Sequence, residues 1–181
     1  MKYRAKIGLI LVGIMGIVFF SCRKFEDYPL EPVIKFDHFS LLLNTQTGKT
    51  DRGVLSISYT DGDGDLGLRS RDTFAPFNRG SEYYYNFLIK YFEKQNGKFV
   101  EVPIVIWNPE DQKFDTITFN SRFPYLTPDH GNKAIKGVIQ DTVYVNNPLS
   151  TFDTIMFKVS IYDRSLNLSN EIETPEIVVV K

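Results

Sequence analysis

Apolar side chains in this sequence alternate over short runs, and no segment keeps the 3.6-residue period of an amphipathic helix. The clearest run covers residues 54–59, in which Leu55, Ile57 and Tyr59 alternate with serines. Alternation is typical of a strand with one buried face, because successive side chains point to opposite sides of a sheet. The 15 phenylalanines and 10 tyrosines also favour strands. The chain is therefore expected to fold into sheets.

Strand-like runs follow one another along the chain, with turn residues between them. We expect strands at 33–44, 54–59, 83–93, 99–107, 114–119, 135–145, 153–162 and 172–180. Asn96-Gly97 lies between the third and fourth runs and is the strongest short signal for a β-hairpin. About eight strands with turns between them predict an all-β chain folded as a single antiparallel β-sandwich over residues 33–181.

The N-terminus has the pattern of a bacterial export signal. Lys2, Arg4 and Lys6 precede an uncharged apolar run at 7–20. That run of 14 residues is short for a membrane span, which needs about 20. Ser21-Cys22 follows at once and resembles the lipobox of bacterial lipoproteins. The resemblance implies a signal peptide at 1–21 and diacylglycerol on Cys22.

Cys22 is the only cysteine, so no internal disulfide can form. Several acyl chains on one residue anchor a protein stably, whereas one chain binds a membrane only marginally. We therefore expect a lipidated tether at 22–32. A short N-terminal membrane anchor and a secretory signal cleaved nearby are the alternatives.

Glu26 and Asp27 resemble the acidic surface-export signals of lipoproteins in the Bacteroidetes, which suggests export to the cell surface.

Removal of residues 1–21 takes away three positive charges and no negative ones. The mature chain then carries 18 basic and 22 acidic residues, a net charge of −4. Such a balance gives no reason to expect nucleic-acid binding. Its length fits one domain with a sizeable core.

Three segments together resemble a group of small lipoproteins of the Bacteroidetes. They are residues 59–67 (YTDGDGDLG), 122–127 (RFPYLT) and the closing hairpin that begins at Phe157. The hairpin is similar to that of bacterial immunoglobulin-like or fibronectin-III-like domains. The resemblance implies an Ig-like sandwich of about eight strands in the cell envelope, held at the outer membrane by its lipid. It implies no activity.

Asp61, Asp63 and Asp65 alternate with glycines directly after the run at 54–59. Three carboxylates at this spacing can converge on a hard cation such as Ca²⁺, which takes six to eight oxygen ligands. The spacing matches the start of an EF-hand loop, and Asp72 falls at its last position. Leu66 replaces the glycine that an EF-hand needs, and flanking helices are missing, so a calcium loop between strands is the better interpretation.

The expected sandwich topology adds two residues to this site. If the acidic loop joins the second and third strands, the turn of the closing hairpin lies at the same end of the sandwich. Asp163 and Asn167 would then complete the shell begun by Asp61, Asp63 and Asp65, close to the tether. The alternative is a solvated acidic turn, because Asp and Gly are good turn residues.

Other candidates have simpler explanations. Tyr83-Tyr84-Tyr85, Phe87 and Trp107 could stack on sugar rings, but aromatic residues in strands are more often core. His38 and His130 lack a second histidine or a cysteine partner for a transition-metal site. The sequence contains no nucleophile elbow, phosphate loop or zinc-helix motif. The two carboxylates that glycoside hydrolysis uses can be far apart in the sequence and come together only in the folded protein, so the sequence leaves this activity open.

The sequence therefore predicts a non-enzymatic, membrane-tethered binding or scaffold module, stabilised by calcium. Its partners would be the membrane, through the lipid, and an envelope protein or a glycan. A carbohydrate-binding or glycoside-hydrolysis accessory protein of the envelope is the alternative.

Overall fold

The computed structural model of the protein describes residues 27–127 and 134–181. The expected signal peptide, Cys22 and His130 lie outside these residues. Strands dominate the described part, with one single-turn 3₁₀ helix, η1, at Glu82–Tyr84. The strands are β1 (Val33–Asn44), β2 (Lys49–Asp61), β3 (Phe87–Gln95), β4 (Lys98–Glu101), β5 (Ile104–Asn108), β6 (Lys113–Ile117), β7 (Ile135–Tyr144), β8 (Thr154–Ile161), β9 (Ile172–Glu173) and β10 (Ile177–Val178).

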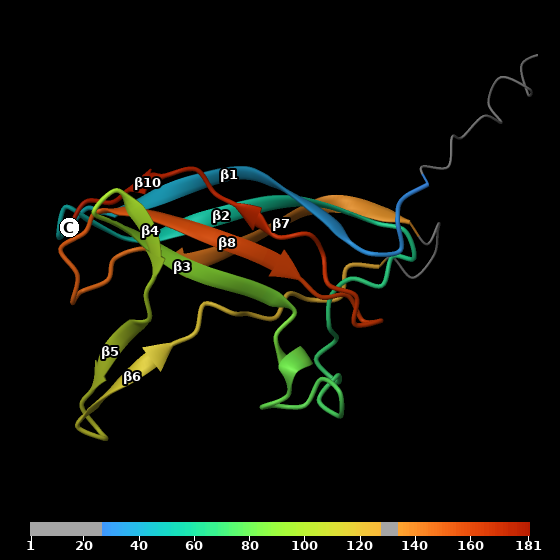
Figure 1. The fold of residues 1–181 in the computed structure, drawn as a ribbon. Helices are drawn as coiled ribbons and strands as arrows, with labels where there is room; N and C mark the ends of the chain where they lie inside the picture. The colour runs from blue at the N-terminus through green and yellow to red at the C-terminus, as the bar shows by residue number, and fades with distance from the viewer. Residues whose placement is uncertain (1–26, 128–133) are drawn as a thin grey trace, which may run out of the picture.

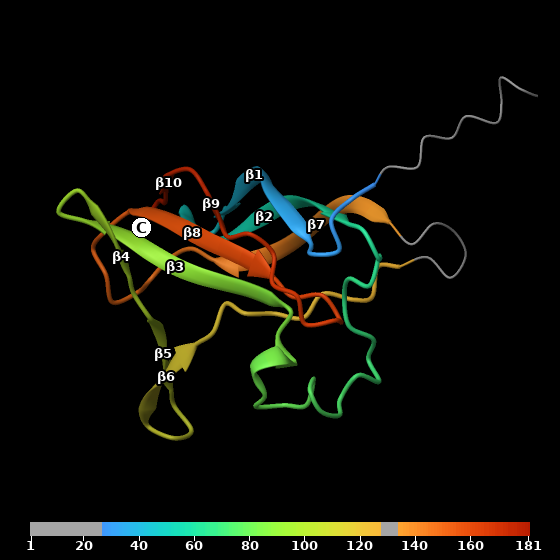
Figure 2. The same cartoon turned by 45° about the vertical axis from the view of Figure 1, so that its right-hand side comes forward.

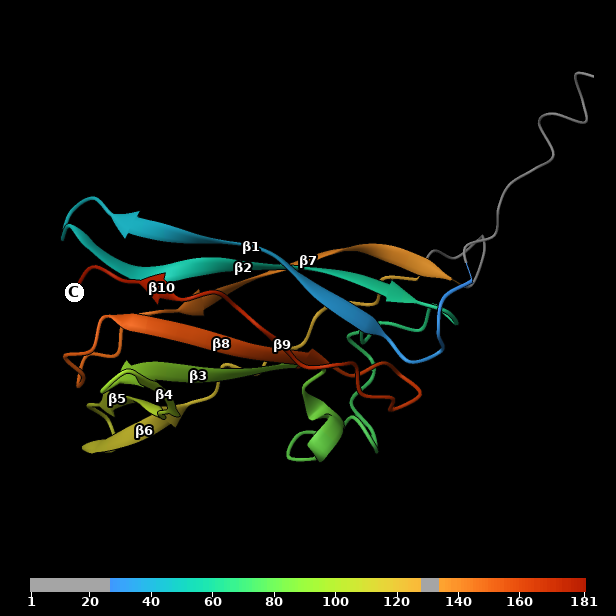
Figure 3. The same cartoon turned by 45° about the horizontal axis from the view of Figure 1, so that its top comes forward.

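The strands form two main antiparallel sheets and one separate hairpin. One sheet has the order β1-β2-β7, and the other has the order β10-β8-β3-β4, with β9 also paired to β8. Figures 1 and 3 show the first sheet lying over the second. The hairpin β5-β6 projects away from both sheets (Figure 1). The expected all-β class and antiparallel pairing are confirmed, and two facing sheets are consistent with a β-sandwich.

The core lies between the two sheets and follows the alternation of the sequence. Leu55, Ile57 and Tyr59 of β2 are buried, as expected. From the opposite sheet, Phe157 packs at ring-centroid distances of 5.7 Å from both Phe39 and Tyr91. Burying such side chains contributes about 1.5–3 kcal/mol each. Aromatic residues of the strands therefore contribute to a core that otherwise consists mainly of isoleucine, leucine and valine.

The described residues hold ten strands, so the expected count of about eight is not confirmed. Two of the expected runs are each divided in two at a proline: Pro103 separates β4 from β5, and Pro175 separates β9 from β10. Proline cannot donate to the ladder of a sheet, which explains both breaks. The Asn-Gly hairpin is confirmed, because Asn96 and Gly97 have φ values of 52° and 81° between β3 and β4.

The two ends of the sandwich differ in what they carry. β1 starts, β2 ends, β3 starts and β8 ends at one end, which is also where the N-terminal tether enters (Figure 2). The C-terminus lies at the opposite end (Figures 1 and 2). We call these the tether end and the distal end. Among the described residues, no helix is long and apolar enough to cross a membrane.

Candidate functional site

Four carboxylates meet at the tether end. Asp61 ends β2, Asp63 and Asp65 lie in the loop that follows it, and Asp163 comes shortly after β8. Each offers one oxygen, and these oxygens all lie within 4.8 Å of one another. In the part of the chain that the structure describes, this is the one group of its kind. The sequence-predicted acidic residues are therefore neighbours in space, including Asp163 from a distant segment.

The loop bends because its glycines permit it. Gly64 has a φ of +69°, a conformation that residues with a side chain rarely adopt. A Cβ on Gly62 would lie 2.2 Å from the carbonyl oxygen of Tyr28, so only glycine fits there. The bend lets the Asp65 N–H donate to Asp61 Oδ2 at 3.0 Å. Alternating Asp and Gly thus turns the carboxylates inward.

The closing hairpin is fastened directly to the acidic loop. Leu66 and Asp163 form a single antiparallel β-bridge, and the Arg164 N–H donates to the Asp65 carbonyl at 3.3 Å. The Ser165 hydroxyl donates to Asp65 Oδ2 at 2.7 Å. These contacts join two loops that are about a hundred residues apart, and they hold Asp163 against the other carboxylates.

Asn167 lies beside the cluster and contacts Asp163. Its backbone N–H and its side-chain Nδ2 donate to the two oxygens of Asp163, at 2.7 and 2.8 Å. Its own carbonyl oxygen accepts from the Asp163 N–H. Asn167 thus orients Asp163 with its donors. Asp72 is not part of the cluster; it pairs with Arg164.

The cluster is short of hydrogen-bond donors. Asp61 is fully buried and Asp163 is 1% exposed. Among the described residues, none donates to Asp61 Oδ1 or to Asp65 Oδ1, although both atoms are buried. Burial raises the pKa of Asp61 to about 7, and the charges of Asp63 and Asp65 add to this. Burial also raises the pKa of Asp163, although the hydrogen bonds from Asn167 oppose the rise.

Only oxygen is offered by this cluster, so a hard cation is the ligand that suits it. Two oxygens placed about 2.4 Å from a central Ca²⁺ are at most about 4.8 Å apart, which matches the spacing of the cluster. A cation would also offset the burial and the repulsion that together raise the pKa of Asp61. His38 lies elsewhere, on β1, with its Nδ1 3.0 Å from Asp37.

The tether contacts the acidic loop. The Gly62 N–H donates to the carbonyl oxygen of Pro29 at 2.8 Å. The Asn170 side chain, from the segment after Asn167, bonds both the N–H and the carbonyl of Ile34, near the start of β1. The last tether residues and the first strand are therefore fixed to the same loops that carry the carboxylates.

The aromatic candidates divide into core and surface. Phe87 is fully buried, and Tyr83 packs edge-on against Tyr162, with ring centroids 5.1 Å apart. Trp107 is different: it is 50% exposed on β5, and it packs only edge-on against Phe114 of β6, which is also exposed. The expectation that Trp107 belongs to the core is not supported by its exposure.

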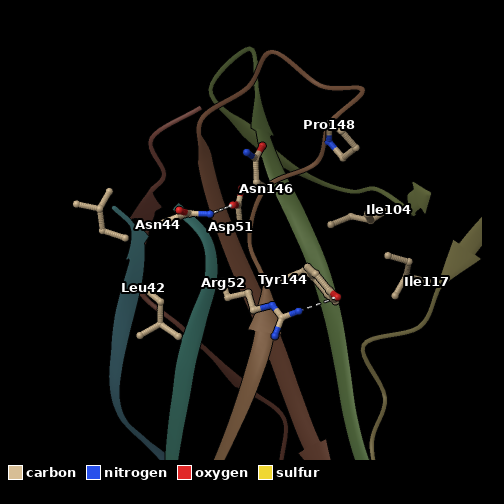
Figure 4. Close-up of a pocket in the computed structure, with 10 residues that line it drawn as sticks. Leu42, Asn44, Asp51, Arg52, Ile104, Ile117, Tyr144, Asn146 and Pro148 are labelled. Atoms are coloured by element: carbon tan, nitrogen blue, oxygen red, sulfur yellow. Dashed lines mark hydrogen bonds between the residues drawn. The ribbon is translucent and has the colours of Figure 1, made fainter. Parts of the chain in front are cut away.

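A hollow of about 620 Å³ opens at the distal end, near the base of the β5-β6 hairpin (Figure 4). Its walls are mainly apolar, and on one wall Arg52 donates to the hydroxyl of Tyr144, its partner on the adjacent strand, at 3.2 Å. Asp51 and two asparagines add polar groups. Its residues come from five separate segments, so no sequence motif could have indicated it.

The protein thus has two regions with distinct chemistry: an acidic, oxygen-lined cluster at the tether end and an amphipathic hollow at the distal end. The first suits a cation, and the second suits a ligand with apolar and polar faces. Comparisons of the chain with protein families, with curated proteins and with solved structures find no match.

Proposed function

We propose that the protein is a non-catalytic binding or scaffold module of the cell envelope, anchored to the outer membrane by lipid on Cys22, and that Ca²⁺ stabilises its tether end. The observation that carries the calcium part is the buried Asp61, which lies among three other carboxylates and whose Oδ1 has no donor among the described residues. A buried carboxylate in that position gains more from a cation than from any group present there.

The sandwich is proposed to be of the immunoglobulin or fibronectin-III type. The order β1-β2-β7 corresponds to strands A, B and E of that fold, and the order β10-β8-β3 to strands G, F and C. β4 then occupies the edge beside strand C. In that arrangement the acidic loop is the B–C loop, and the turn at Asp163 belongs to the F–G hairpin.

The contact between the tether and the acidic loop gives the cation a role in the anchored protein. The Pro29 carbonyl bonds the Gly62 N–H, and Gly62 lies between two of the carboxylates. Ordering of the loop by Ca²⁺ would therefore also fix the direction in which the tether leaves the domain. We infer that calcium sets how the module stands on its membrane.

Thermal unfolding of the lipidated protein in calcium and in chelator tests the cation. Calcium is expected to raise the Tm, since a ligand that binds only the folded state stabilises it by about 2.7 kcal/mol at a hundred times its Kd. Asp63→Ala should abolish the rise, whereas Glu110→Ala, at an exposed carboxylate in the β5-β6 turn, should keep it. An unchanged wild-type Tm at millimolar calcium would refute the site.

Mass spectrometry of protein isolated from membranes tests the anchor separately. An N-terminus that begins at a lipid-modified Cys22 is the expected result. An intact Met1, or a free N-terminus at another position, would contradict it.

Carbohydrate binding is the second candidate, and the hollow of Figure 4 favours it. The ring of Tyr144 lies there beside Arg52, Asp51 and Asn146, and aromatic rings with planar polar side chains are suited to sugars. Of the ten lining residues drawn, Asp51 is the single carboxylate, so the set suits binding better than glycoside hydrolysis, which uses two. Retardation in gels containing envelope polysaccharides should disappear in Tyr144→Ala; wild-type protein that is not retarded would exclude this function.

A further inference from the structure

Phe74 is the most exposed large apolar side chain among the described residues, at 81%. It lies in the long connection between β2 and β3, which hangs below the two sheets in the half of the molecule that holds the tether end (Figure 2). Ala75 and Pro76, which follow it, are exposed as well. We call residues 71–79 the Phe74 tip. A group of exposed apolar residues at one point of a surface indicates an interaction site.

Backbone hydrogen bonds give the Phe74 tip a defined conformation. The Phe77 N–H donates to the Phe74 carbonyl at 2.8 Å. The guanidinium of Arg122 donates to the carbonyls of Asp72, Phe77 and Tyr84, at 2.9, 3.2 and 2.8 Å. The base of the tip is thus clamped to the body of the protein, and the clamp holds Phe74 out in solvent.

The charge around Phe74 is positive. Arg71 and Arg79 flank it, and both are exposed. The one acidic residue in the tip, Asp72, is 12% exposed at its side chain and pairs with Arg164. An apolar side chain between exposed arginines is complementary to the interface of an anionic bilayer, where headgroup phosphates meet acyl chains.

The tether keeps this end of the molecule close to the bilayer. Pro29 is fixed to Gly62, and seven residue-to-residue steps, across six intervening residues, separate it from Cys22. Fully extended, they span about 25 Å at most. With lipid on Cys22, the loops at the tether end therefore cannot move far from the headgroups, while the distal end points away from them.

We propose that the Phe74 tip is a membrane-contact element: Phe74 inserts between anionic headgroups, and Arg71 and Arg79 bind their phosphates. The proposal rests on the lipid anchor proposed above and names the surface against which the anchored domain lies. The lipid anchor and the Phe74 tip support each other, because the anchor raises the local concentration of bilayer around a weakly binding tip.

The cation site is connected to the tip through two contacts. The Arg164 N–H bonds the Asp65 carbonyl, and the Arg164 side chain pairs with Asp72. Arg164 also lies over the ring of Phe77, 5.7 Å from its centroid. Loss of the cation would loosen the loop at Asp65, and the position of Arg164 depends on that loop. Chelation is therefore expected to weaken the membrane contact of the tip.

The single tryptophan of the chain makes a direct test possible. The full lipidated protein is placed in vesicles of phosphatidylethanolamine and phosphatidylglycerol. Some of the lipids carry brominated acyl chains, which quench the fluorescence of tryptophan. Phe74→Trp in a Trp107→Phe background reports on the tip, and the wild-type protein reports on the distal end. The indole introduced at the tip should lose most of its fluorescence in calcium and less in chelator, whereas Trp107 of the wild type should keep its fluorescence.

Two further substitutions and one control complete the test. Arg71→Glu with Arg79→Glu should reduce the quenching of the tip indole, because both charges then repel the headgroups. Fluorescence of the tip indole that bromine leaves unchanged, in protein that floats with the vesicles, would overturn the proposal and leave the tip free for a protein partner. Protein that does not float, or that carries no lipid on Cys22, would instead count against the anchor. Because Phe74 is exposed, the Tm should be unaffected by its replacement.

Discussion

Glu93 and Asp61 are both buried carboxylates, at 1% and 0% exposure, but they lie at opposite ends of the sandwich and have opposite surroundings. At the distal end, Glu93 accepts hydrogen bonds from the Tyr91 hydroxyl, the Asn147 amide and the Ser150 hydroxyl, at 3.2, 3.0 and 2.7 Å. At the tether end, Asp61 accepts one backbone hydrogen bond and faces three more carboxylates.

The difference shows two ways to keep a carboxylate away from water. Removing a charge from water is costly unless hydrogen bonds or an opposite charge replace the lost solvation. The protein itself supplies those groups around Glu93. Around Asp61 it supplies more negative charge, so the missing partner has to come from solution. The first arrangement serves stability alone, whereas the second can respond to a ligand.

Removal of the Glu93 carboxylate is expected to have the largest effect on stability. Glu93→Ala leaves three donors without an acceptor, two of them buried, and opens a cavity, and it should lower the free energy of unfolding by about 4 kcal/mol. The loss should be the same in calcium and in chelator, as measured by urea unfolding. Glu101→Ala, at an exposed glutamate on β4, should cost less than about 0.5 kcal/mol. A calcium-dependent loss in Glu93→Ala would show that the two ends are not independent.

Asp61→Asn should give the opposite pattern. In chelator the amide removes a repelled charge, so the variant should be at least as stable as the wild type. In calcium the wild type should gain about 2.7 kcal/mol at a hundred times its Kd, and the variant should gain almost nothing. Calcium titrations followed by unfolding measure both. A variant that is destabilised equally with and without calcium would mean that Asp61 is structural, as Glu93 is.

The sequence predicts the acidic cluster at the tether end better than the surroundings of Glu93 at the distal end, because most residues of the cluster lie close together in the chain. Asp61, Asp63 and Asp65 sit within five residues, and alternating glycines leave few conformations for the loop. Asp163 can be added because the ends of strands in a sandwich meet at the same edge. Asn167 lies beside Asp163, as expected, and its amide donates to that carboxylate; its role as a ligand stays a prediction, because sequence does not tell which atom of an amide faces its neighbour.

Glu93 carries no such local signal, since its partners come from a neighbouring strand position and from a loop more than fifty residues away. The alternation of β3 places Glu93 on the same face as Ile89 and Tyr91, but it does not show which groups donate to its carboxylate. Similarly, Trp107 ends the continuous apolar run 104–107 but is exposed, because β5 pairs with β6 in a hairpin outside the two main sheets. Contacts between distant segments therefore account for most of what the sequence does not predict.

The pH dependence of stability should also distinguish the tether end from the distal end, but the expected change in stability is smaller than those above. Asp61 has a folded-state pKa of about 7, above its unfolded value, so the folded metal-free protein holds the proton more tightly. Its contribution to stability is therefore fully present below about pH 4 and is lost as the pH rises through 7. The chelated wild type should lose about 1–2 kcal/mol between pH 5 and pH 8, after allowance for screening. Asp61→Asn should lose clearly less.

Because protons compete with the cation, calcium affinity should fall below pH 7, and an affinity independent of pH would contradict the assigned pKa.

The smallest expected effect tests the role of Asn167. If its amide only orients Asp163, Asn167→Ala removes one hydrogen bond of 2.8 Å while the backbone N–H of residue 167 still donates. The variant should lose about 1 kcal/mol of stability in chelator, and its calcium affinity should fall less than about tenfold, because every carboxylate oxygen remains. Isothermal titration with calcium measures the affinity, and Asn170→Ala, which loses the contact with Ile34, serves as a control for loosening of the same loop. A loss of affinity as large as that of Asp63→Ala would instead make Asn167 a ligand, which would require its side chain to turn its oxygen toward the cation when calcium is bound.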